Sequence, residues 1–246
     1  MKAMILAAGL GTRLRPLTDD RPKALVEVAG RTMLEIALSR LRSFGIREVI
    51  VNAHHFAEMI VGYLRKNDSF GMRVEVSRED VLLDTGGGLK KVAPFFSEGS
   101  GESDQPFVLH NVDVISRIDL ARMLQSHREN QSLATLAVQH RKTSRYLLFD
   151  KQLQLCGRQT EPDQRKEMVD PACPAHALAF CGIHIISPRL LTMMSEEGAF
   201  SIINSYLRLA AQKEKILAFV ADEYYWSDLG KPESVRQAAR DAKKWS

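Results

Sequence analysis

Glycine and cationic side chains follow the first apolar run of the chain, which ends at Ala8. Gly9 and Gly11 leave backbone N–H groups free of Cβ atoms, Thr12 adds a hydroxyl group, and Arg13 can bind phosphate oxygens through two hydrogen bonds. The spacing excludes the dinucleotide-binding fingerprint, which needs a glycine at position 14, and it also excludes a Walker loop. These residue types favour a phosphate-binding loop, and a plain tight turn is the alternative.

Two prolines and a lysine extend this loop. Pro16 and Pro22 restrict the backbone, and Lys23 follows the second proline directly. A stiff segment therefore holds Lys23 at a set distance from Arg13. Two cations placed in this way suit a polyphosphate.

Two carboxylates far apart in the sequence could ligate a metal ion. Asp113 comes at the end of an apolar strand, directly after His110, Asn111 and Val112, and Asp228 follows aromatic residues in "YYWSD". Hard oxygen ligands of this kind bind Mg²⁺ that bridges nucleotide phosphates. The alternatives are a helix cap or a solvated strand end at Asp113 and a cap of the last helix at Asp228.

A second glycine-rich stretch, "DTGGGLKK", begins at Asp84 and Thr85 and places Gly86 to Gly88 at the start of a helix. Glycines there allow a base or a sugar to approach the backbone closely, and a helix N-terminus favours anions. A flexible hinge is the alternative reading.

Alternating strand and helix patterns must position these residues. The first half predicts parallel strands joined by helices, and the helix at 32–45 begins with a capping box of Thr32 and Glu35. From residue 132 onward the strands look antiparallel, with a hairpin around Lys151. Polar residues 158–175, which include Glu161, Lys166 and Glu167, read as a solvated loop. The remaining predicted strands are 4–8, 47–53, 72–79, 107–115, 176–187 and 216–221, and the remaining predicted helices are 56–67, 200–214 and 231–245.

Composition limits the class of protein. The 246 residues are 45% hydrophobic and 26% charged, which allows a sizeable core and argues against a disordered chain. The net charge of +4 is too diffuse to indicate nucleic acid. Three cysteines without metal-site spacing, no apolar run of about 18 residues and no secretion signal favour a cytoplasmic protein with reduced thiols.

The opening segment "LAAGLGTRLRPLTDDRPKALVEVAG" strongly resembles the sugar-1-phosphate nucleotidyltransferases, whose motif reads G-x-G-T-R-[LM]-x-P-[LM]-T followed by P-K. "LLDTGGGLKKV", "NVDV", "FCGIHIIS" and "YYWSDLGKPESV" resemble the family's later motifs in order, so the resemblance runs to about residue 236. The chain departs from the family at Val112, where glycine is usual, and it lacks the E-K-P motif. Val112 is expected to narrow the space beside the sugar. The matching positions of the opening motif are Gly9, Gly11, Thr12, Arg13, Leu14, Pro16, Leu17, Thr18, Pro22 and Lys23.

The resemblance implies a Rossmann-like α/β/α fold with a mostly parallel mixed sheet, as in glycosyltransferase-A-like nucleotidyltransferases. It implies a single domain, 1–246, with a nucleotide-binding core at 1–115 and a sugar-binding region with closing helices at 116–246. The implied reaction is in-line attack of a sugar 1-phosphate on the α-phosphorus of a nucleoside triphosphate, with pyrophosphate leaving and no covalent enzyme nucleophile. The implied partners are these two substrates, without nucleic acid or membrane.

The resemblance also assigns roles to residues. Arg13, Lys23 and Asp113 would be catalytic, and Asp113 with Asp228 would hold Mg²⁺. Phosphocholine cytidylyltransferases share the opening motif, and catalytically silent nucleotide-sugar sensors are known among such relatives, so both remain alternatives. The implied nucleotide-binding residues are Leu6, Ala8, Gly9, Gly11, Thr12, Arg13, Lys23, Asp84, Thr85 and Gly87, and the implied sugar-binding residues are Asn111, Gly88 and Gly182.

Overall fold

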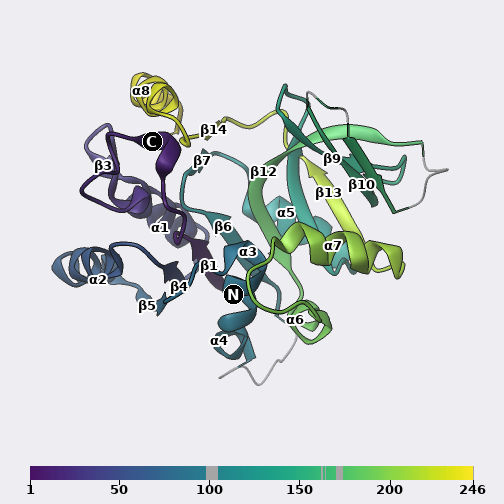
Figure 1. Ribbon diagram of the computed structural model, residues 1–246, viewed down its shortest axis with the longest axis horizontal. Helices are drawn as coiled ribbons and strands as arrows, with labels where there is room; N and C mark the ends of the chain where they lie inside the picture. The colour runs from purple at the N-terminus through teal and green to yellow at the C-terminus, as the bar shows by residue number, and fades with distance from the viewer. Residues whose placement is uncertain (98–104, 162, 164, 170–173, 246) are drawn as a thin grey trace.

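Four parallel strands form the first half of the sheet, as the alternating pattern predicts. The computed structural model describes residues 1–97, 105–161, 163, 165–169 and 174–245. In it, β1 (Lys2–Leu6) lies between β4 (Glu48–Ala53) and β6 (Phe107–Asn111), and β5 (Arg73–Arg78) extends the sheet beyond β4 (Figure 1). The helices that connect these strands are α1 (Met33–Ser43), α2 (Ala57–Lys66), α3 (Asp84–Lys91) and α4 (Ala93–Ser97).

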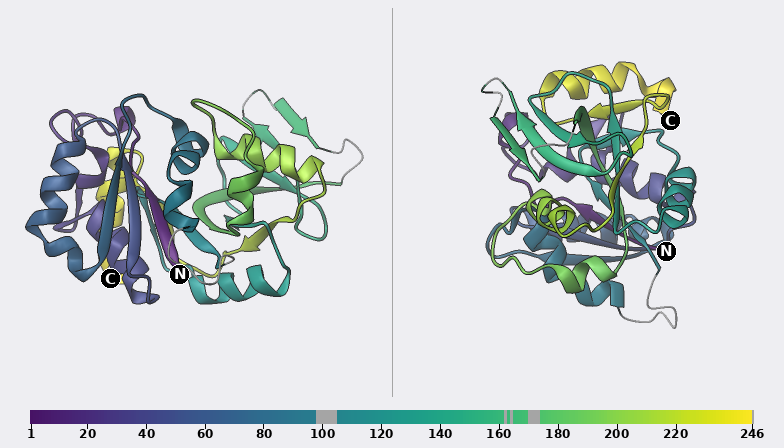
Figure 2. Two further views of the ribbon diagram at one scale, coloured as in Figure 1. Left: turned by 90° about the horizontal axis from the view of Figure 1, so that it is seen from below. Right: turned by 90° about the vertical axis from the view of Figure 1, so that its right-hand side faces the viewer.

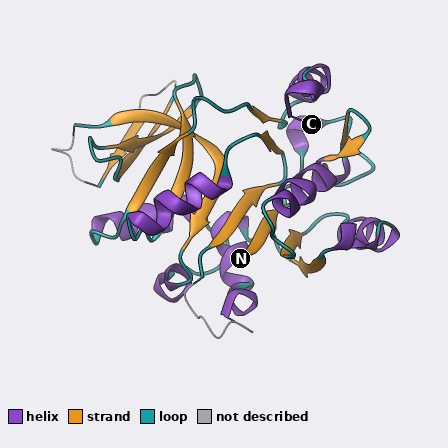
Figure 3. Ribbon diagram, turned by 180° about the vertical axis from the view of Figure 1, so that it is seen from behind, coloured by secondary structure: helices purple, strands orange, loops and turns teal. Residues whose placement is uncertain are grey.

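Both faces of this sheet are buried. Ala3 and Ile5 of β1 belong to a core cluster shared with α1, α2 and α5 (Leu120–Glu129), whereas Met4 belongs to a second cluster shared with α3, α4 and α7 (Ile202–Ala211). Since successive strand residues point to opposite faces, the two clusters are the two sides of one sheet. Figures 2 and 3 show helices on both faces. The expected α/β/α layering is confirmed.

The second half of the sheet is antiparallel around β12 (His176–Ile186). This strand pairs with β6, with β8 (Ala134–Gln139) and with β9 (Arg145–Phe149), and β13 (Ile216–Val220) runs parallel to β8. The strand order is β11-β10-β9-β12-β6-β1-β4-β5, with β8 and β13 branching from β12. One ten-stranded sheet therefore runs through both regions that the sequence suggested; their division at residue 115 stays a prediction.

Two predicted segments differ from the structure. The expected strand at 107–115 is broken at Val112 and Asp113 into β6 and β7 (Val114–Ser116). The expected loop at 158–175 instead contains the end of β10 (Leu155–Thr160) and all of β11 (Arg165–Met168), which pair antiparallel. The prediction failed because β11 is exposed on both faces and carries no apolar alternation. The predicted loop residues 162, 164 and 170–173, among them Cys173, lie outside the described residues.

The other predicted elements occur in the expected order. The hairpin around Lys151 is confirmed by the antiparallel pairing of β9 with β10. No helix in the described part of the chain is long and apolar enough to cross a membrane. The helix predicted at 231–245 is divided into α8 (Pro232–Arg240) and α9 (Ala242–Trp245). The sequence did not predict the short elements β2 (Glu27–Val28), β3 (Arg31–Thr32), α6 (Arg189–Met193) and β14 (Trp226–Asp228).

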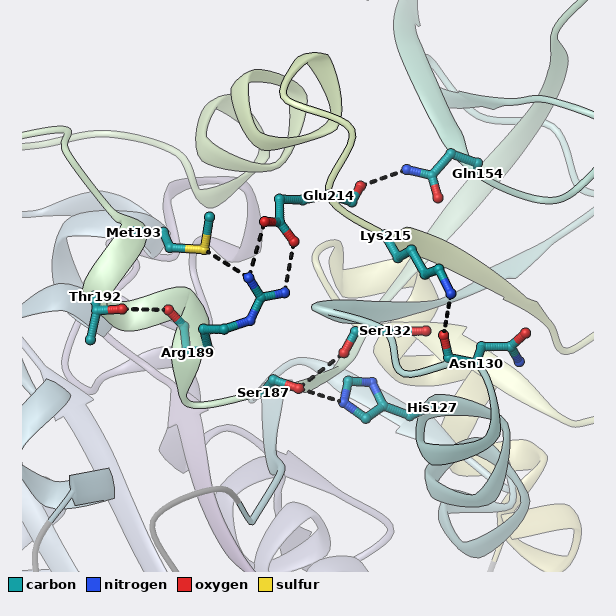
Figure 4. Close-up of polar contacts among 10 residues, drawn as sticks. All are labelled: His127, Asn130, Ser132, Gln154, Ser187, Arg189, Thr192, Met193, Glu214 and Lys215. Atoms are coloured by element: carbon teal, nitrogen blue, oxygen red, sulfur yellow. Dashed lines mark hydrogen bonds and ion pairs between the residues drawn. The ribbon is translucent and has the colours of Figure 1, made fainter.

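Polar contacts surround the end of the sheet where β6 begins, opposite the end that carries Asn111 (Figure 4). Ser187 follows β12 at the end that pairs with the start of β6. Its hydroxyl donates to the carbonyl of Ser132 at 3.0 Å and lies 3.1 Å from Nε2 of His127. Nearby, Arg189 binds both carboxylate oxygens of Glu214. These contacts join α5 to the end of β12, and α6 to the segment that follows α7.

The capping box at the start of α1 is confirmed. Thr32 Oγ1 accepts a hydrogen bond from the backbone N–H of Glu35 at 3.1 Å and donates one to the hydroxyl of Tyr63 at 3.1 Å. We expect Thr32→Ala to lower the free energy of unfolding by about 1 kcal/mol, because a helix N–H loses its acceptor. Denaturant unfolding measures this loss. Thr32→Ser keeps the hydroxyl and serves as the control; an equal loss in both variants would contradict the capping role.

Candidate active site

The loop after β1 turns sharply at Gly11. Gly11 adopts a left-handed conformation with φ of 67°, and its carbonyl accepts a hydrogen bond from Thr18 Oγ1 at 2.9 Å. A Cβ atom on Gly11 would lie 3.0 Å from Thr18 Cγ2, so both the angle and the space require glycine. Short 3₁₀ turns at Thr12–Leu14 and Lys23–Leu25 orient the two ends of the loop.

Lys23, in the loop that follows β1, and Asp113, which follows β6, form an ion pair. Lys23 Nζ lies 2.8 Å from Asp113 Oδ2, and the side chains are only 16% and 11% exposed. A Cβ atom on Gly9 would lie 3.7 Å from the same Nζ. The structure therefore brings together Gly9, Lys23 and Asp113, three of the predicted site residues.

Asp228 lies near Asp113 because its strand, β14, pairs with β7. β14 runs antiparallel to β7, and the N–H of Leu229 donates to the carbonyl of Asp113 at 2.8 Å. Asp228 Oδ1 accepts a hydrogen bond from the N–H of Gly230 at 2.6 Å. A Cβ atom on Gly230 would lie 2.8 Å from that oxygen and 2.9 Å from Nη2 of Arg13. Arg13 and Asp228 thus lie against the backbone of one glycine.

The donor set fits a hard divalent cation. Asp113 is buried and Asp228 is exposed, and Asp228 pairs with Val114, the residue directly after Asp113. Mg²⁺ is commonly held by one or two carboxylates, with waters and substrate phosphates completing its shell. Within the described residues, no group of three or more His, Cys, Asp or Glu side chains forms a metal cage. Two carboxylates without further protein ligands would leave coordination positions for water and phosphate oxygens, as an open Mg²⁺ site requires.

A cavity of about 550 Å³ reaches Asn111, two residues before Asp113. Asp84 and Thr85 line it from the start of α3, and Asn111 lines it from the end of β6. Gly182 of β12 adopts φ of +73°, and a Cβ atom there would lie 2.8 Å from Asn111 Nδ2. Asn111 and Gly182, both predicted to bind sugar, are therefore adjacent.

Trp226 of the motif "YYWSD" holds the part of β12 that contains Gly182. Trp226 Nε1 donates to the carbonyl of Cys181 at 2.8 Å, and the guanidinium of Arg141 lies 3.8 Å from the centre of the Trp226 ring. Arg141 also donates to the carbonyl of Phe180 at 2.7 Å. These contacts hold the part of β12 where its register against β8 shifts, between Phe180 and His184.

The glycines of the second loop pack against protein backbone. The N–H groups of Gly86 and Gly87 donate to the carbonyl of Phe200 at 2.9 and 3.3 Å, and a Cβ atom on Gly87 would collide with the carbonyl oxygen of Gly198. A Cβ atom on Gly88 would lie 2.8 Å from both Asn52 Nδ2 and Glu79 Oε1. These glycines allow α3 to approach neighbouring segments closely. Contacts of Gly87 and Gly88 with ligands stay predictions.

Asn52 and Glu79 support both loops and were not identified from the sequence. Asn52 Oδ1 accepts from the N–H of Ala7 at 2.7 Å, and its amide donates to Glu79 Oε1 at 2.7 Å. Glu79 Oε2 then accepts from the N–H of Leu83 at 3.0 Å. Both side chains are buried. The available signal was a polar residue inside the apolar strand "EVIVNA" and a carboxylate just after the next strand.

The remaining predicted residues lie along β1 and its loop. Leu6 pairs with Asn52 on one side and with Asn111 on the other, Ala8 is buried, and Thr12 is exposed at the first 3₁₀ turn.

Val112 is 1% exposed and packs in the core cluster of α1 and α2. The expectation that Val112 narrows the acceptor space is therefore wrong, because its side chain points into the core.

The segment read as a solvated loop also reaches the cavity. Glu167 lies on β11 and lines the cavity, and it forms an ion pair of 2.7 Å with Arg158 of β10. Lys166 lies between Arg165 and Glu167 on the same strand, and the amide of Gln159 donates to Glu161. The solvated-loop reading is corrected: part of this segment is a strand that forms one wall of the cavity.

Comparison with known proteins identifies the family. A model of the family described as nucleotidyl transferase matches residues 2–244. The chain belongs to the nucleotidyl transferase family. Over 247 residues it is 33% identical to an N-acetylmuramate alpha-1-phosphate uridylyltransferase from Caulobacter vibrioides, covering 94% of this chain and 93% of that protein. It is 28% identical to a mannose-1-phosphate guanyltransferase from Yarrowia lipolytica, covering 94% of this chain and 61% of that protein.

A solved structure supports the fold of this nucleotidyltransferase. HddC from Yersinia pseudotuberculosis, crystallised with GMP-PN, superimposes with a TM-score of 0.77 at 22% identity, covering 98% of this chain and 99% of that one. The two curated relatives are named for different bases and different sugars. Family membership therefore establishes the type of enzyme and leaves the nucleotide and the sugar open.

Buried groups near the cavity of the nucleotidyltransferase are held uncharged. Burial raises the pKa of the Cys181 thiol to about 12, so this thiol is not a nucleophile at neutral pH. Burial lowers the pKa of His184 to about 3 and that of His110 to about 4. His184 Nδ1 lies within hydrogen-bond distance of the Tyr206 hydroxyl, at 2.8 Å.

The two histidines make stability depend on pH. The unfolded chain binds protons below a pKa of about 6.5, whereas the folded histidines stay neutral down to about 4 and about 3. The free energy of unfolding should therefore fall as the pH drops from 6.5 toward 4, by roughly 1 kcal/mol per pH unit for each histidine. Denaturant unfolding between pH 5 and 7 measures this slope. His184→Gln should reduce the slope, and an unchanged slope would contradict the assignment.

Proposed function

We propose that this nucleotidyltransferase transfers a nucleoside monophosphate from a nucleoside triphosphate to a sugar 1-phosphate and releases pyrophosphate. The observation that carries the proposal is the convergence of Arg13, Lys23, Asp113 and Asp228 at the phosphate loop, beside a cavity bordered by Asn111. Two cations and two carboxylates suit a triphosphate with its cation, and the cavity offers space for an acceptor.

In the proposed reaction, an oxygen of the sugar 1-phosphate attacks the α-phosphorus. The bond from that phosphorus to the β,γ-pyrophosphate breaks, and pyrophosphate leaves with the negative charge. The acceptor is already anionic, so the protein needs no base and no covalent intermediate; it contributes position and charge neutralisation. The carboxylate of Asp113 orients Nζ of Lys23 beside Gly9, where Lys23 would meet the α-phosphate. Arg13 would bind the departing pyrophosphate.

Asp113 and Asp228 are the residues that would hold Mg²⁺. When bound, this cation neutralises phosphate charge and fixes the geometry of the triphosphate. Asp84 and Thr85 would contact the base, with Gly87 beside them, while Asn111, Gly88 and Gly182 would contact the sugar. The buried free thiol of Cys181 supports a cytoplasmic location.

A screen of pyrophosphate release tests the proposal. Four nucleoside triphosphates are each combined with a panel of sugar 1-phosphates and with phosphocholine, in the presence of Mg²⁺. We expect release with at least one sugar 1-phosphate and none with phosphocholine. Release with phosphocholine alone would replace the proposal by a cytidylyltransferase, and binding of a nucleotide sugar without any release would indicate a sensor.

A further inference from the structure

A row of residues across the outer strands of the sheet carries two arginines. Arg145 of β9 stands directly opposite Thr160 of β10, and Thr160 stands directly opposite Arg165 of β11. Directly opposite residues in an antiparallel sheet project from the same face, so Arg145 and Arg165 flank Thr160 on one face. Two strand spacings separate their Cα atoms by about 10 Å.

This row faces the acceptor cavity. Arg145, Thr160 and Arg165 all line the cavity of about 550 Å³ that Asn111 borders. In the strand order, β9 lies two strands from β6, which carries Asn111, and β11 lies four strands away. The arginines therefore line the part of the cavity farther from the phosphate loop.

The arginine of the neighbouring row, Arg158, has a carboxylate partner, whereas Arg145 and Arg165 have none among the described residues. Arg158 pairs with Glu167 at 2.7 Å and donates to Asn204 Oδ1 at 2.9 Å. In the described part of the chain, neither the guanidinium of Arg145 nor that of Arg165 has an ion pair or a hydrogen bond. The other carboxylate of the lining, Asp84, is at the start of α3 and accepts from the N–H of Thr85 at 2.6 Å.

Two like charges that face one cavity attract an anion. Guanidinium groups bind carboxylate and phosphate through paired hydrogen bonds, and a cavity wall with one sign of charge raises the local concentration of the opposite sign. We propose that the acceptor of this enzyme carries a second anionic group, away from its 1-phosphate, and that Arg145 and Arg165 bind it. The inference rests on the proposed function and specifies the class of sugar.

Matched acceptors test the second anionic group. Glucuronic acid 1-phosphate and glucose 1-phosphate differ by one carboxylate, N-acetylmuramic acid 1-phosphate and N-acetylglucosamine 1-phosphate differ by a lactyl carboxylate, and glucose 1,6-bisphosphate adds a second phosphate. We expect kcat/KM for at least one acidic acceptor to exceed that of its neutral partner by about 10- to 100-fold, the range of one or two charge-assisted hydrogen bonds. The favoured pair distinguishes a carboxylate from a phosphate.

Substitutions test whether Arg145 and Arg165 bind the second anionic group. Arg145→Gln and Arg165→Gln should each lower kcat/KM for the acidic acceptor by about tenfold or more, with the neutral partner unchanged within about twofold. Lys166→Gln is the matched control, because it removes one positive charge from the same strand; Lys166 neighbours Arg165 in sequence, so its side chain points to the opposite face. A loss that is equal for acidic and neutral acceptors would overturn the inference.

The two proposals fail in different ways. Equal kcat/KM for acidic and neutral acceptors in the wild-type enzyme would overturn the second anionic group and leave the proposed function standing. Absence of pyrophosphate release with every nucleotide and every acceptor would overturn the proposed function itself.

Discussion

Asp113→Asn is expected to abolish turnover, with kcat reduced by at least about 10³-fold. The substitution keeps the shape of the side chain and removes the charge that would hold the cation and that pairs with Lys23 at 2.8 Å. A bound cation contributes several kcal/mol to stabilisation of phosphoryl-transfer charge, which corresponds to a factor of that order. Steady-state pyrophosphate release at saturating Mg²⁺ measures the loss.

Folding must be separated from catalysis in this variant. Lys23 is 16% exposed and loses its ionic partner, so a thermal unfolding curve of the variant belongs beside the kinetics. Asp222→Asn is the control: Asp222 pairs with His140 at 2.6 Å, outside the candidate site, and its substitution should leave kcat unchanged. Near wild-type kcat in a folded Asp113→Asn protein would refute the metal assignment.

Arg13→Ala is expected to lower kcat by roughly 10²- to 10³-fold, with a smaller change in KM for the nucleotide. An oriented charge-assisted contact to a group that gains charge in the transition state contributes on the order of 2 to 4 kcal/mol. The guanidinium already lies against Gly230 beside Asp228, so its position does not depend on the substrate alone. Interactions made mainly in the transition state appear in kcat.

Two further variants sharpen this test. Arg13→Lys should restore only part of the rate, because an ammonium group cannot reproduce the two-pronged contact. Arg15→Ala is the matched control, since Arg15 lies two residues further on, is 70% exposed and pairs with Asp19 at 3.4 Å. If Arg13→Ala raised KM and left kcat intact, Arg13 would be a ground-state anchor for the nucleotide.

Local signals made much of the fold predictable. Thr32 and Glu35 are three residues apart, and the hairpin at Lys151 joins strands that are adjacent in the sequence. A short stretch of sequence is therefore enough to predict both the helix start and the hairpin. The parallel crossovers followed from the alternation of strand and helix. β11 was not predictable, because an edge strand exposed on both faces has no pattern that distinguishes it from a loop.

The sequence indicated several residues of the candidate site, but it did not indicate their pairings or the supporting residues Asn52 and Glu79. The sequence indicated Lys23 and Asp113 separately, but only the fold shows that residues 90 positions apart form an ion pair. Likewise, "DTGGGLKK" indicated a close backbone approach without showing that Phe200 is the nearest partner of Gly86. Long-range contacts depend on the packing of whole elements, which no short stretch of sequence encodes.

The junction between α3 and α7 bears on attempts to redesign this enzyme. Phe200 accepts from the N–H groups of Gly86 and Gly87, and the N–H of Ile202 donates to Thr85 Oγ1 at 3.0 Å. From the same helix, Asn204 holds Arg158 in the wall of the acceptor cavity. A chimaera that imported residues 84–88 from a relative with another base would leave 198–204 facing foreign backbone. Under the proposed function, this junction connects the segment that would contact the base with the wall that would contact the sugar, and we expect the two segments to be exchangeable only as one block.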